Sequence, residues 1–410
     1  MIEPRVRPLP GIVPVISTAI AMFCGCVAFA QADQSALKAL RTAPVEKFAV
    51  NAGFRDWGPS TLAGNVILAG SPTGAGGLFA VDTLTGKVKW SHRPAFKSGT
   101  GSVSTPPAVS GGTVVVPYAA AYPGAVVALS LATGKELWRG PDPVLDAAVV
   151  IRGDLAYILA KDGAFHALDL ATGKERWKVA LSASRPGCTS RPIVMDNNIY
   201  LTSSADAVAG DPKKPAGNYL FALDAATGQE RWRYRAEAPY VHQGVCLGQP
   251  VVTATTIYGA GDSYLYAIAR DTGRDQWKPV EIRRVVEGRE RQVSVFGLVD
   301  AGSVLVGITT GYLIAFEKDS GRTSWELAGQ FTERAPSTAV AGRVLYFQGS
   351  VASQPAPSPR GTLYALDLDT RAILWSYSRK TAEANWSFGS VTPVDGGLWV
   401  DSYQALVKLQ

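Results

Sequence analysis

The chain has 410 residues, which is too long for one ordinary domain of ~150 residues and predicts two or three domains or an array of repeats. Charged residues make up 18% and apolar residues 47%, which argues against a disordered chain, a coiled coil or a multi-span membrane protein. The net charge of +6 comes without a dense block of Lys and Arg, so nucleic-acid binding is not indicated.

Residues 1–32 have the pattern of an export signal. Arg5 and Arg7 precede an uncharged run of 25 residues from Pro8 to Ala32, which ends in the small-residue triplet Ala30-Gln31-Ala32. A basic start, an apolar middle and a small-residue exit are typical of a cleaved secretory signal. We therefore expect residues 33–410 to be exported, either to the periplasm or out of the cell.

Two other interpretations of this segment stay open. The uncharged run is long enough to remain in a bilayer as an uncleaved anchor. Gly25 also precedes Cys26, as a small residue precedes the lipidated cysteine of a lipoprotein signal. We expect membrane association only if Cys26 is lipidated or the signal is not cleaved.

One motif then recurs seven times, as in FHALDLATGKERW, and each copy ends in a tryptophan. The distance from the Asp-type position to this Trp is eight residues in every copy, whereas successive Trp residues are 39 to 55 residues apart. A constant core with a variable remainder indicates one structural unit with different loops. The seven tryptophans are Trp90, Trp138, Trp177, Trp232, Trp277, Trp325 and Trp375.

Each copy of the motif predicts a strand, a tight turn and another strand. In four copies an Asp carboxylate closes the turn by accepting backbone N–H groups, and a Gly four residues after the Asp position supplies the positive φ in six copies. Ser130, Ala269 and Glu317 replace the Asp in copies two, five and six, so we expect weaker turns there. Arg371 stands at the glycine position of the seventh copy, so we expect strain in that turn. We interpret the Trp as packing that locks one sheet to the next, because stacking on a ligand would not need seven regularly spaced copies.

Further short strands precede each motif, so the repeat predicts an all-β, eight-bladed β-propeller of four-stranded antiparallel blades. The 378 residues from Asp33 onward, divided by ~47 per blade, give about eight blades in one domain. Residues Leu406–Leu409 match a third strand, after which the chain ends. We expect residues 46–50 to complete the last blade and close the ring.

The connections between strands two and three, and between blades, hold the variable length, and they share one face of a propeller. Long loops on a rigid scaffold commonly carry recognition, so we place a partner site on this long-loop face. Within it, Arg283, Arg284, Arg289 and Arg291 form the most charged stretch, and His242 falls near the channel mouth. A solvated hairpin without a partner is the alternative interpretation of the arginines.

Cys188 and Cys246 each lie four residues before a proline in neighbouring repeats, so they share one register. In an exported protein we predict that they form a disulfide, and two separate buried thiols are the alternative. The chain has no metal pattern of H-x-x-x-H type, no G-x-S-x-G elbow, no phosphate-binding loop and no CxxC. We therefore assign no catalytic, metal or cofactor-binding residue.

The repeated ALDxxTGxxxW resembles the signature repeat of the pyrroloquinoline-quinone (PQQ) propeller superfamily over nearly the whole exported chain. That family includes quinoprotein dehydrogenases, in which adjacent cysteines and a calcium site hold the quinone. This chain has no adjacent cysteine pair. In size it is more similar to the BamB-like propellers of outer-membrane assembly, a resemblance that implies a non-enzymatic envelope scaffold.

Two functional hypotheses follow. The first is an exported, monomeric and non-catalytic propeller that binds envelope proteins and needs no cofactor. The second is an oxidoreductase that binds PQQ with Ca²⁺, or a sensor of a small molecule in the channel; sugar or peptide binding also stays open.

Overall fold

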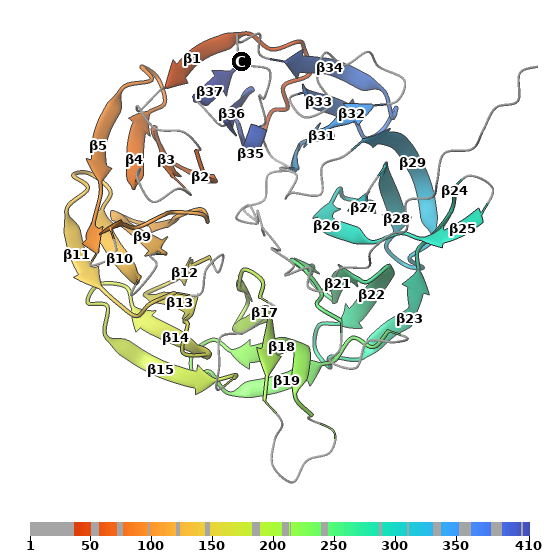
Figure 1. Cartoon of the computed structure of the whole chain (residues 1–410), viewed down its shortest axis with the longest axis horizontal. Helices are drawn as coiled ribbons and strands as arrows, with labels where there is room; N and C mark the ends of the chain where they lie inside the picture. The colour runs from red at the N-terminus through yellow and green to blue at the C-terminus, as the bar shows by residue number, and fades with distance from the viewer. Residues whose placement is uncertain are drawn as a thin grey trace, which may run out of the picture.

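The computed structural model describes residues 37–50, 57–71, 77–96, 99–119, 124–143, 148–182, 189–206, 213, 215–238, 245–286, 289–309, 311–330, 338–351, 362–378, 388–402 and 405–410. These residues form β-strands and turns, with no helix among them. The strands make eight sheets around a central axis (Figure 1), so the predicted eight-bladed propeller is confirmed. The predicted export signal, residues 1–32, lies outside the described part.

The first four blades follow one another along the chain, each with four strands. Blade 1 contains β2 (Ser60–Ala63), β3 (Val66–Gly70), β4 (Leu78–Asp82) and β5 (Val88–His92). Blade 2 contains β8 (Ala108–Ser110), β9 (Thr113–Tyr118), β10 (Ala125–Ser130) and β11 (Glu136–Arg139). Blade 3 contains β12 (Val150–Arg152), β13 (Leu155–Leu159), β14 (Ala164–Asp169) and β15 (Glu175–Ala180). Blade 4 contains β16 (Ile193–Met195), β17 (Asn198–Ala205), β18 (Gly217–Asp224) and β19 (Glu230–Tyr234).

The second half of the ring repeats this plan. Blade 5 contains β20 (Val251–Val252), β21 (Thr256–Gly261), β22 (Tyr264–Ala269) and β23 (Asp275–Glu281). Blade 6 contains β26 (Val295–Asp300), β27 (Val304–Thr309), β28 (Tyr312–Glu317) and β29 (Thr323–Gln330), with β32 (Ser350–Val351) on its edge. Blade 7 contains β30 (Ala339–Ala341), β31 (Val344–Gln348), β33 (Thr362–Asp367) and β34 (Ile373–Ser378). Blade 8 contains β35 (Phe388–Val394), β36 (Gly397–Ser402), β37 (Leu406–Leu409) and β1 (Glu46–Val50).

Two hairpins lie outside the blades. One pairs β6 (Ala95–Phe96) with β7 (Gly99–Thr100), and the other pairs β24 (Arg283–Val286) with β25 (Arg289–Gln292).

The core consists of layers between the blades. The middle strands are buried on both faces, as in β3 and β31, whereas an outer strand such as β15 alternates between exposed and half-buried residues. The buried apolar side chains form eight clusters, and each cluster joins two neighbouring blades. Burial of apolar surface between sheets therefore holds the ring together.

The turn between the third and fourth strands has the same backbone hydrogen bond in all seven copies of the motif, from the N–H at the glycine position to the carbonyl at the Asp position, and blades 1, 3, 4 and 7 have an Asp there. In blade 1 the Asp82 carboxylate accepts the N–H groups of Leu84 (3.0 Å) and Thr85 (2.9 Å), and Gly86 has a φ of 69°. The Thr85 N–H is the main reason that the pKa of Asp82 is lowered. Arg371 adopts a φ of 61° at the glycine position of blade 7, so this turn keeps its shape in a conformation that disfavours a side chain.

The indoles of the repeat lie between blades. In five blades the indole N–H donates to the carbonyl that follows the Asp position of the next blade, at 2.8 to 3.3 Å, and the pairs are Trp90–Leu131, Trp138–Leu170, Trp177–Ala225, Trp232–Arg270 and Trp277–Lys318. A methyl group on Gly228 would lie 2.6 Å from the Trp177 ring, so the turn glycine also lets the indole approach. Trp325, whose neighbour in the next blade is the turn with Arg371, makes no such bond to any described residue. In the equivalent turns of blades 2, 3 and 5, a methyl group on the glycine would lie 2.6 Å from the indole of the preceding blade, so a side chain at this position is poorly compatible with that placement of the indole.

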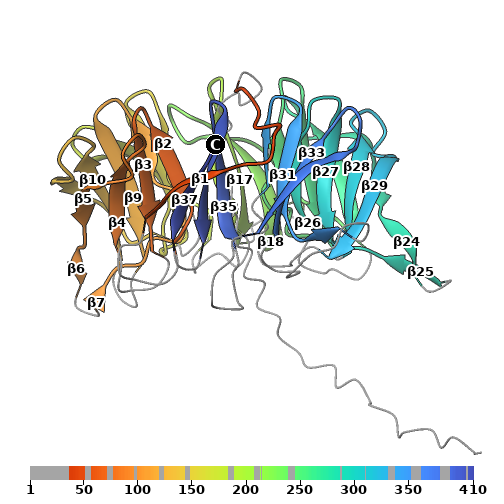
Figure 2. The same ribbon diagram turned by 90° about the horizontal axis from the view of Figure 1, so that it is seen from above.

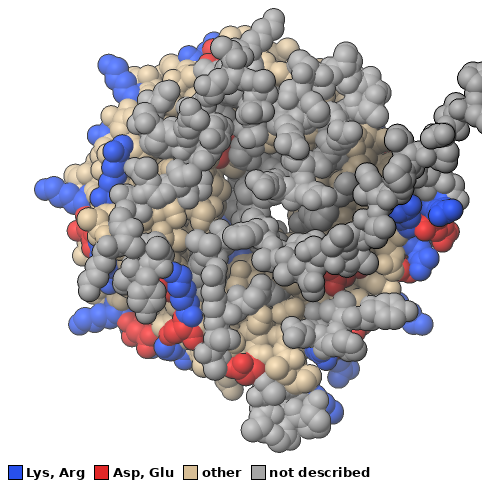
Figure 3. Space-filling model, viewed as in Figure 1, with Lys and Arg blue, Asp and Glu red and all other residues tan. Residues whose placement is uncertain are grey.

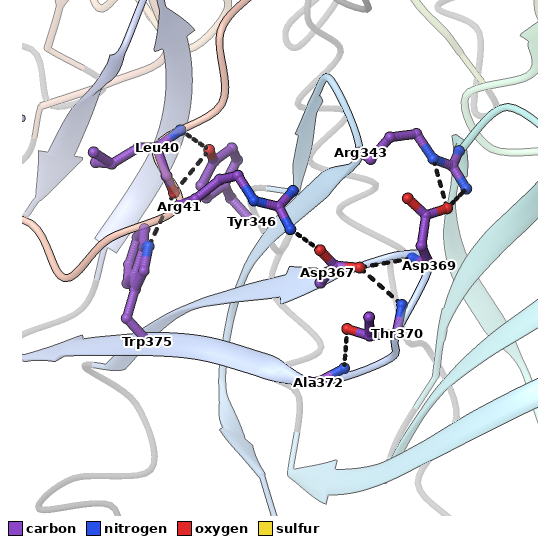
Figure 4. A network of polar contacts seen from close by, with 9 residues as sticks. All are labelled: Leu40, Arg41, Arg343, Tyr346, Asp367, Asp369, Thr370, Ala372 and Trp375. Atoms are coloured by element: carbon purple, nitrogen blue, oxygen red, sulfur yellow. Dashed lines mark hydrogen bonds and ion pairs between the residues drawn. The ribbon is translucent and has the colours of Figure 1, made fainter.

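The N-terminal segment completes the seventh interface, although blade 8 has no turn of this kind. The Leu40 carbonyl accepts the Trp375 indole N–H at 2.9 Å and the Tyr346 hydroxyl at 3.4 Å (Figure 4). Beside it, Arg41 pairs with the carboxylate of Asp367. The Thr370 N–H above all, with help from Arg41, lowers the pKa of Asp367 to about 2. Residues before the first strand thus take the place of the missing turn.

The ring is closed as predicted. β1 pairs antiparallel with β37, from Glu46 opposite Leu409 to Val50 opposite Leu406. The first and last of the described strands therefore share one sheet, and none of the described blades ends the ring with an unpaired third strand (Figure 1).

Candidate partner-binding face

The hairpins β6–β7 and β24–β25 project from the same face of the ring (Figure 2). Each hairpin follows the fourth strand of a blade, β6–β7 after blade 1 and β24–β25 after blade 5. Because blades 1 and 5 are four positions apart in a ring of eight, the two hairpins lie at opposite sides of this face (Figure 2). This is the long-loop face.

The connection from β23 of blade 5 to β26 of blade 6 contains the hairpin β24–β25. Its register pairs Arg283 with Gln292, Arg284 with Arg291, Val285 with Glu290 and Val286 with Arg289. Directly opposed residues share a face of a hairpin, and so do alternate residues along a strand. Arg283 therefore lies on one face, and Arg284, Arg289 and Arg291 lie together on the other.

The face that carries Arg283 is internally compensated. Arg283 Nε lies 2.8 Å from Glu281 Oε2, and its NH1 lies 3.5 Å from Glu290 Oε2. Gln292 also donates to Glu281, and the bonds from Arg283 and Gln292 lower the pKa of Glu281. Val285 shares this face and is 65% exposed.

The opposite face, which we call the arginine face (Arg284, Arg289 and Arg291), is not compensated. Arg284 pairs with Glu326 of β29 and lies 5.7 Å from the centre of the Tyr312 ring. Arg289 and Arg291 are exposed, and neither has an ion-pair or hydrogen-bond partner among the described residues. Figure 3 shows basic and acidic side chains gathered at the edge of the ring where β24 and β25 lie in Figure 1.

The histidines are distributed around the ring. His242 lies outside the described residues. His92 Nδ1 is 2.9 Å from the Tyr118 hydroxyl, and burial lowers the pKa of His92. His166 is buried in blade 3, with Nδ1 2.8 Å from Glu175 and Nε2 3.4 Å from Asp162. The described residues bring no three side chains of His, Cys, Asp or Glu together at a metal-binding distance.

The segments that follow the two cysteines are in direct contact. The Arg191 N–H donates to Gln249 Oε1 at 2.9 Å, and Gln249 Nε2 donates to the Arg191 carbonyl at 3.3 Å. Arg191 and Gln249 each lie three residues after a cysteine. Cys188 itself lies outside the described residues, so its pairing with Cys246 stays a prediction.

The buried carboxylate of Asp401 was not predicted from the sequence. Asp401 in β36 is 1% exposed, and its Oδ1 accepts both the backbone N–H and the hydroxyl of Ser390 in β35. Its Oδ2 has no partner among the described residues. Burial raises the pKa of Asp401 to about 8. The other seven blades place an uncharged residue at this register, either apolar as Leu159 or polar as Thr202 and Gln348, so the charge was the available signal.

The family model described as "Outer membrane protein assembly factor BamB" matches residues 34–278, 207–297 and 261–406. The chain belongs to this family. Its matched segments together cover the described propeller, so the family relationship extends over all eight blades.

Solved structures agree on the fold. The crystal structure of BamB from Moraxella catarrhalis is similar with a TM-score of 0.65 and 16% identity, over 90% of this chain and 99% of that one. The quinohemoprotein alcohol dehydrogenase from Comamonas testosteroni is similar with a TM-score of 0.59 and 14% identity, over 90% of this chain and 78% of that one. At such identities the likeness shows the fold alone.

Part of the chain is also similar in sequence to a quinoprotein dehydrogenase. The quinoprotein alcohol dehydrogenase PedH from Pseudomonas putida is 27% identical over 134 residues, which is 30% of this chain. The matched stretch spans 19% of the length of that enzyme. Within the described residues of this BamB-family chain, no helix is long and apolar enough to cross a membrane.

Proposed function

We propose that this BamB-family chain is an exported, non-catalytic scaffold that binds partner proteins in the cell envelope through its long-loop face. The observation that carries the proposal is the hairpin β24–β25, which projects from that face (Figure 2). Its residues Arg289 and Arg291 are exposed. Membership of the BamB family supports a scaffold role, and the pattern of residues 1–32 supports export.

Site-specific photo-cross-linking in intact cells tests this proposal. A photoreactive amino acid at Val285, which is 65% exposed, samples the long-loop face. The same amino acid at Leu84, which is 71% exposed and lies in a turn on the other face, is the matched control. We expect adducts with envelope proteins from position 285 and none from position 84. Absence of adducts at position 285 would contradict the proposal.

A second candidate function is oxidation of an alcohol or sugar with a bound quinone. The similarity to PedH over 134 residues favours it. Among the described residues, no three side chains of His, Cys, Asp or Glu lie together where they could hold a metal ion, so these residues offer no such site for the calcium that would accompany a quinone. Incubation of the purified protein with PQQ and Ca²⁺, followed by dye reduction with alcohols and sugars, tests this function; turnover would replace the scaffold proposal.

A further inference from the structure

The two faces of the hairpin β24–β25 differ in charge. On one face the positive charge of Arg283 meets the carboxylates of Glu281 and Glu290. On the arginine face, Arg284 pairs with Glu326, and no ion pair of Arg289 or Arg291 is found among the described residues. Arg284 and Arg291 are also directly opposed across the strands, and like charges in this position repel each other. The arginine face therefore has a surplus of positive charge that an anionic partner would neutralise.

Arg284 is fixed, whereas Arg289 and Arg291 are available. The guanidinium of Arg284 is held by Glu326 and the Tyr312 ring, both of blade 6, so this residue ties the hairpin to the body of the ring. Arg289 and Arg291 belong to β25 and extend into solvent. The free guanidinium groups of Arg289 and Arg291 therefore lie on the hairpin β24–β25, which Arg284 holds in position against blade 6.

The spacing of the free arginines restricts the shape of the partner. Residues two apart on one strand project to the same side, about 6.6 to 7 Å from each other. An extended polypeptide places its alternate side chains at the same interval. Arginine also binds carboxylates through two parallel hydrogen bonds, which fixes the direction of approach.

We propose that the arginine face binds an extended acidic segment of a partner protein, with Asp or Glu at every second position. This inference rests on the proposed function and names the chemistry of the partner at that face. Carboxylates at alternate positions meet Arg289 and Arg291 in register, whereas a contiguous acidic run places half of its charges on the far side.

Fluorescence anisotropy with the full exported chain provides the test. The probe is a labelled eight-residue peptide of alternating Glu and Thr, and a peptide with the same composition but contiguous Glu residues is the comparison. We expect the alternating peptide to bind more tightly, with an affinity that falls as salt increases. In the double variant Arg289→Glu/Arg291→Glu we expect the affinity for the alternating peptide to fall by roughly tenfold or more, because both charge pairs with the peptide are lost.

Two controls separate recognition from general charge. The variant Lys87→Glu/Lys135→Glu makes the same charge change with exposed lysines of the opposite face, and we expect its affinity to stay within about twofold. An alternating Lys and Thr peptide should bind the Arg289→Glu/Arg291→Glu variant more tightly than the wild type. Circular dichroism confirms that each variant is folded.

The inference is overturned if the double variant binds the alternating peptide as the wild type does. It is also overturned if vesicles containing phosphatidylglycerol, and not the peptide, bind through Arg289 and Arg291. If cross-links from position 285 persist unchanged in the double variant, the scaffold proposal stands and the arginine-face inference fails. If position 285 gives no cross-links even when Arg289 and Arg291 are both present, the scaffold proposal itself is wrong.

Discussion

Lys408 and Phe48 together replace the tryptophan of the repeat where the ring closes. Phe48 pairs with Lys408 after a bulge in β1, as Trp177 pairs with Ala167 in blade 3, and a methyl group on Gly86 would lie 3.1 Å from the Phe48 ring. Phe48 has no N–H to donate. Lys408 Nζ lies 5.7 Å from the centre of the Phe48 ring and donates to the Thr83 carbonyl at 2.9 Å, the carbonyl that an indole would reach.

Replacement of Lys408 by Met should weaken ring closure. The variant keeps the apolar stem but loses the hydrogen bond to Thr83 and the contact with the Phe48 ring, so we expect a loss of about 1 to 2 kcal/mol in the free energy of unfolding. Urea denaturation measures it. The exposed neighbour Lys47, changed to Met, is the control and should have little effect. Addition of Phe48→Trp to Lys408→Met should restore part of the loss, and unchanged stability of Lys408→Met would show that the lysine has no closing role.

Replacement of Arg371 by Gly should stabilise the protein. The change relieves a φ of 61° at a position that is glycine in the other six copies of the motif. We expect a gain of about 1 kcal/mol, measured as a higher melting temperature. Gly228→Ala, in the equivalent turn of blade 4, should lower it, because the methyl group would meet Trp177 at 2.6 Å. A gain from both variants would contradict this account of the turn.

Truncation of Trp177 to Ala should destabilise the fold severely. The indole packs against Tyr157 and Phe165 and donates to the Ala225 carbonyl, so we expect a loss of about 3 to 5 kcal/mol. Trp325→Ala should cost less, because that indole makes no bond of this kind to the described residues. Thermal unfolding of both variants gives the comparison, and unchanged melting of Trp177→Ala would count against the locking role.

Asp401 should make stability depend on pH. Its pKa is about 8 in the folded protein and about 3.9 when unfolded, so the folded state keeps a proton that the unfolded state releases. The contribution of this group to stability therefore falls as the pH rises from about 4 to about 8 and is constant above that range. Asp401→Asn removes the effect, because a neutral amide oxygen still accepts from Ser390.

We accordingly expect Asp401→Asn to match the wild type near pH 4 and to exceed it near pH 8 by an amount on the order of a few kcal/mol. Denaturation curves at the two pH values measure the difference. Asp395→Asn, in the turn between β35 and β36, is a suitable control for the loss of one carboxylate. An equal effect of Asp401→Asn at both pH values would argue against a proton held at this site.

A disulfide between Cys188 and Cys246 should be present in exported protein. The contact between Arg191 and Gln249 brings the two following segments together, and a bridge of this kind contributes about 2 to 4 kcal/mol. Mass spectrometry after alkylation without reduction should find no modified cysteine among the two. Cys188→Ser should leave one alkylated thiol, and two free thiols in the exported wild type would exclude the bridge.

Much of the fold follows from local sequence. The closure by residues 46–50 was predicted because the last copy of the repeat has a third strand without a fourth. The eight-residue interval between Asp and Trp, the turn glycine and the repeat length together predicted the blades and their number. Each of these features resides within one repeat, where strand, turn and packing residue are neighbours in the chain. The departure at Arg371 was visible for the same reason.

The partner-binding chemistry depended on tertiary structure. The sequence marked Arg283, Arg284, Arg289 and Arg291 as one group, but the register of β24 and β25 divides them between a compensated and an uncompensated face. Similarly, the Leu40 carbonyl accepts a hydrogen bond from Trp375, 335 positions away in the chain, and Lys408 donates one to the Thr83 carbonyl, 325 positions away. No local pattern specifies such pairs, because they meet only when the ring brings the two ends of the chain into one sheet.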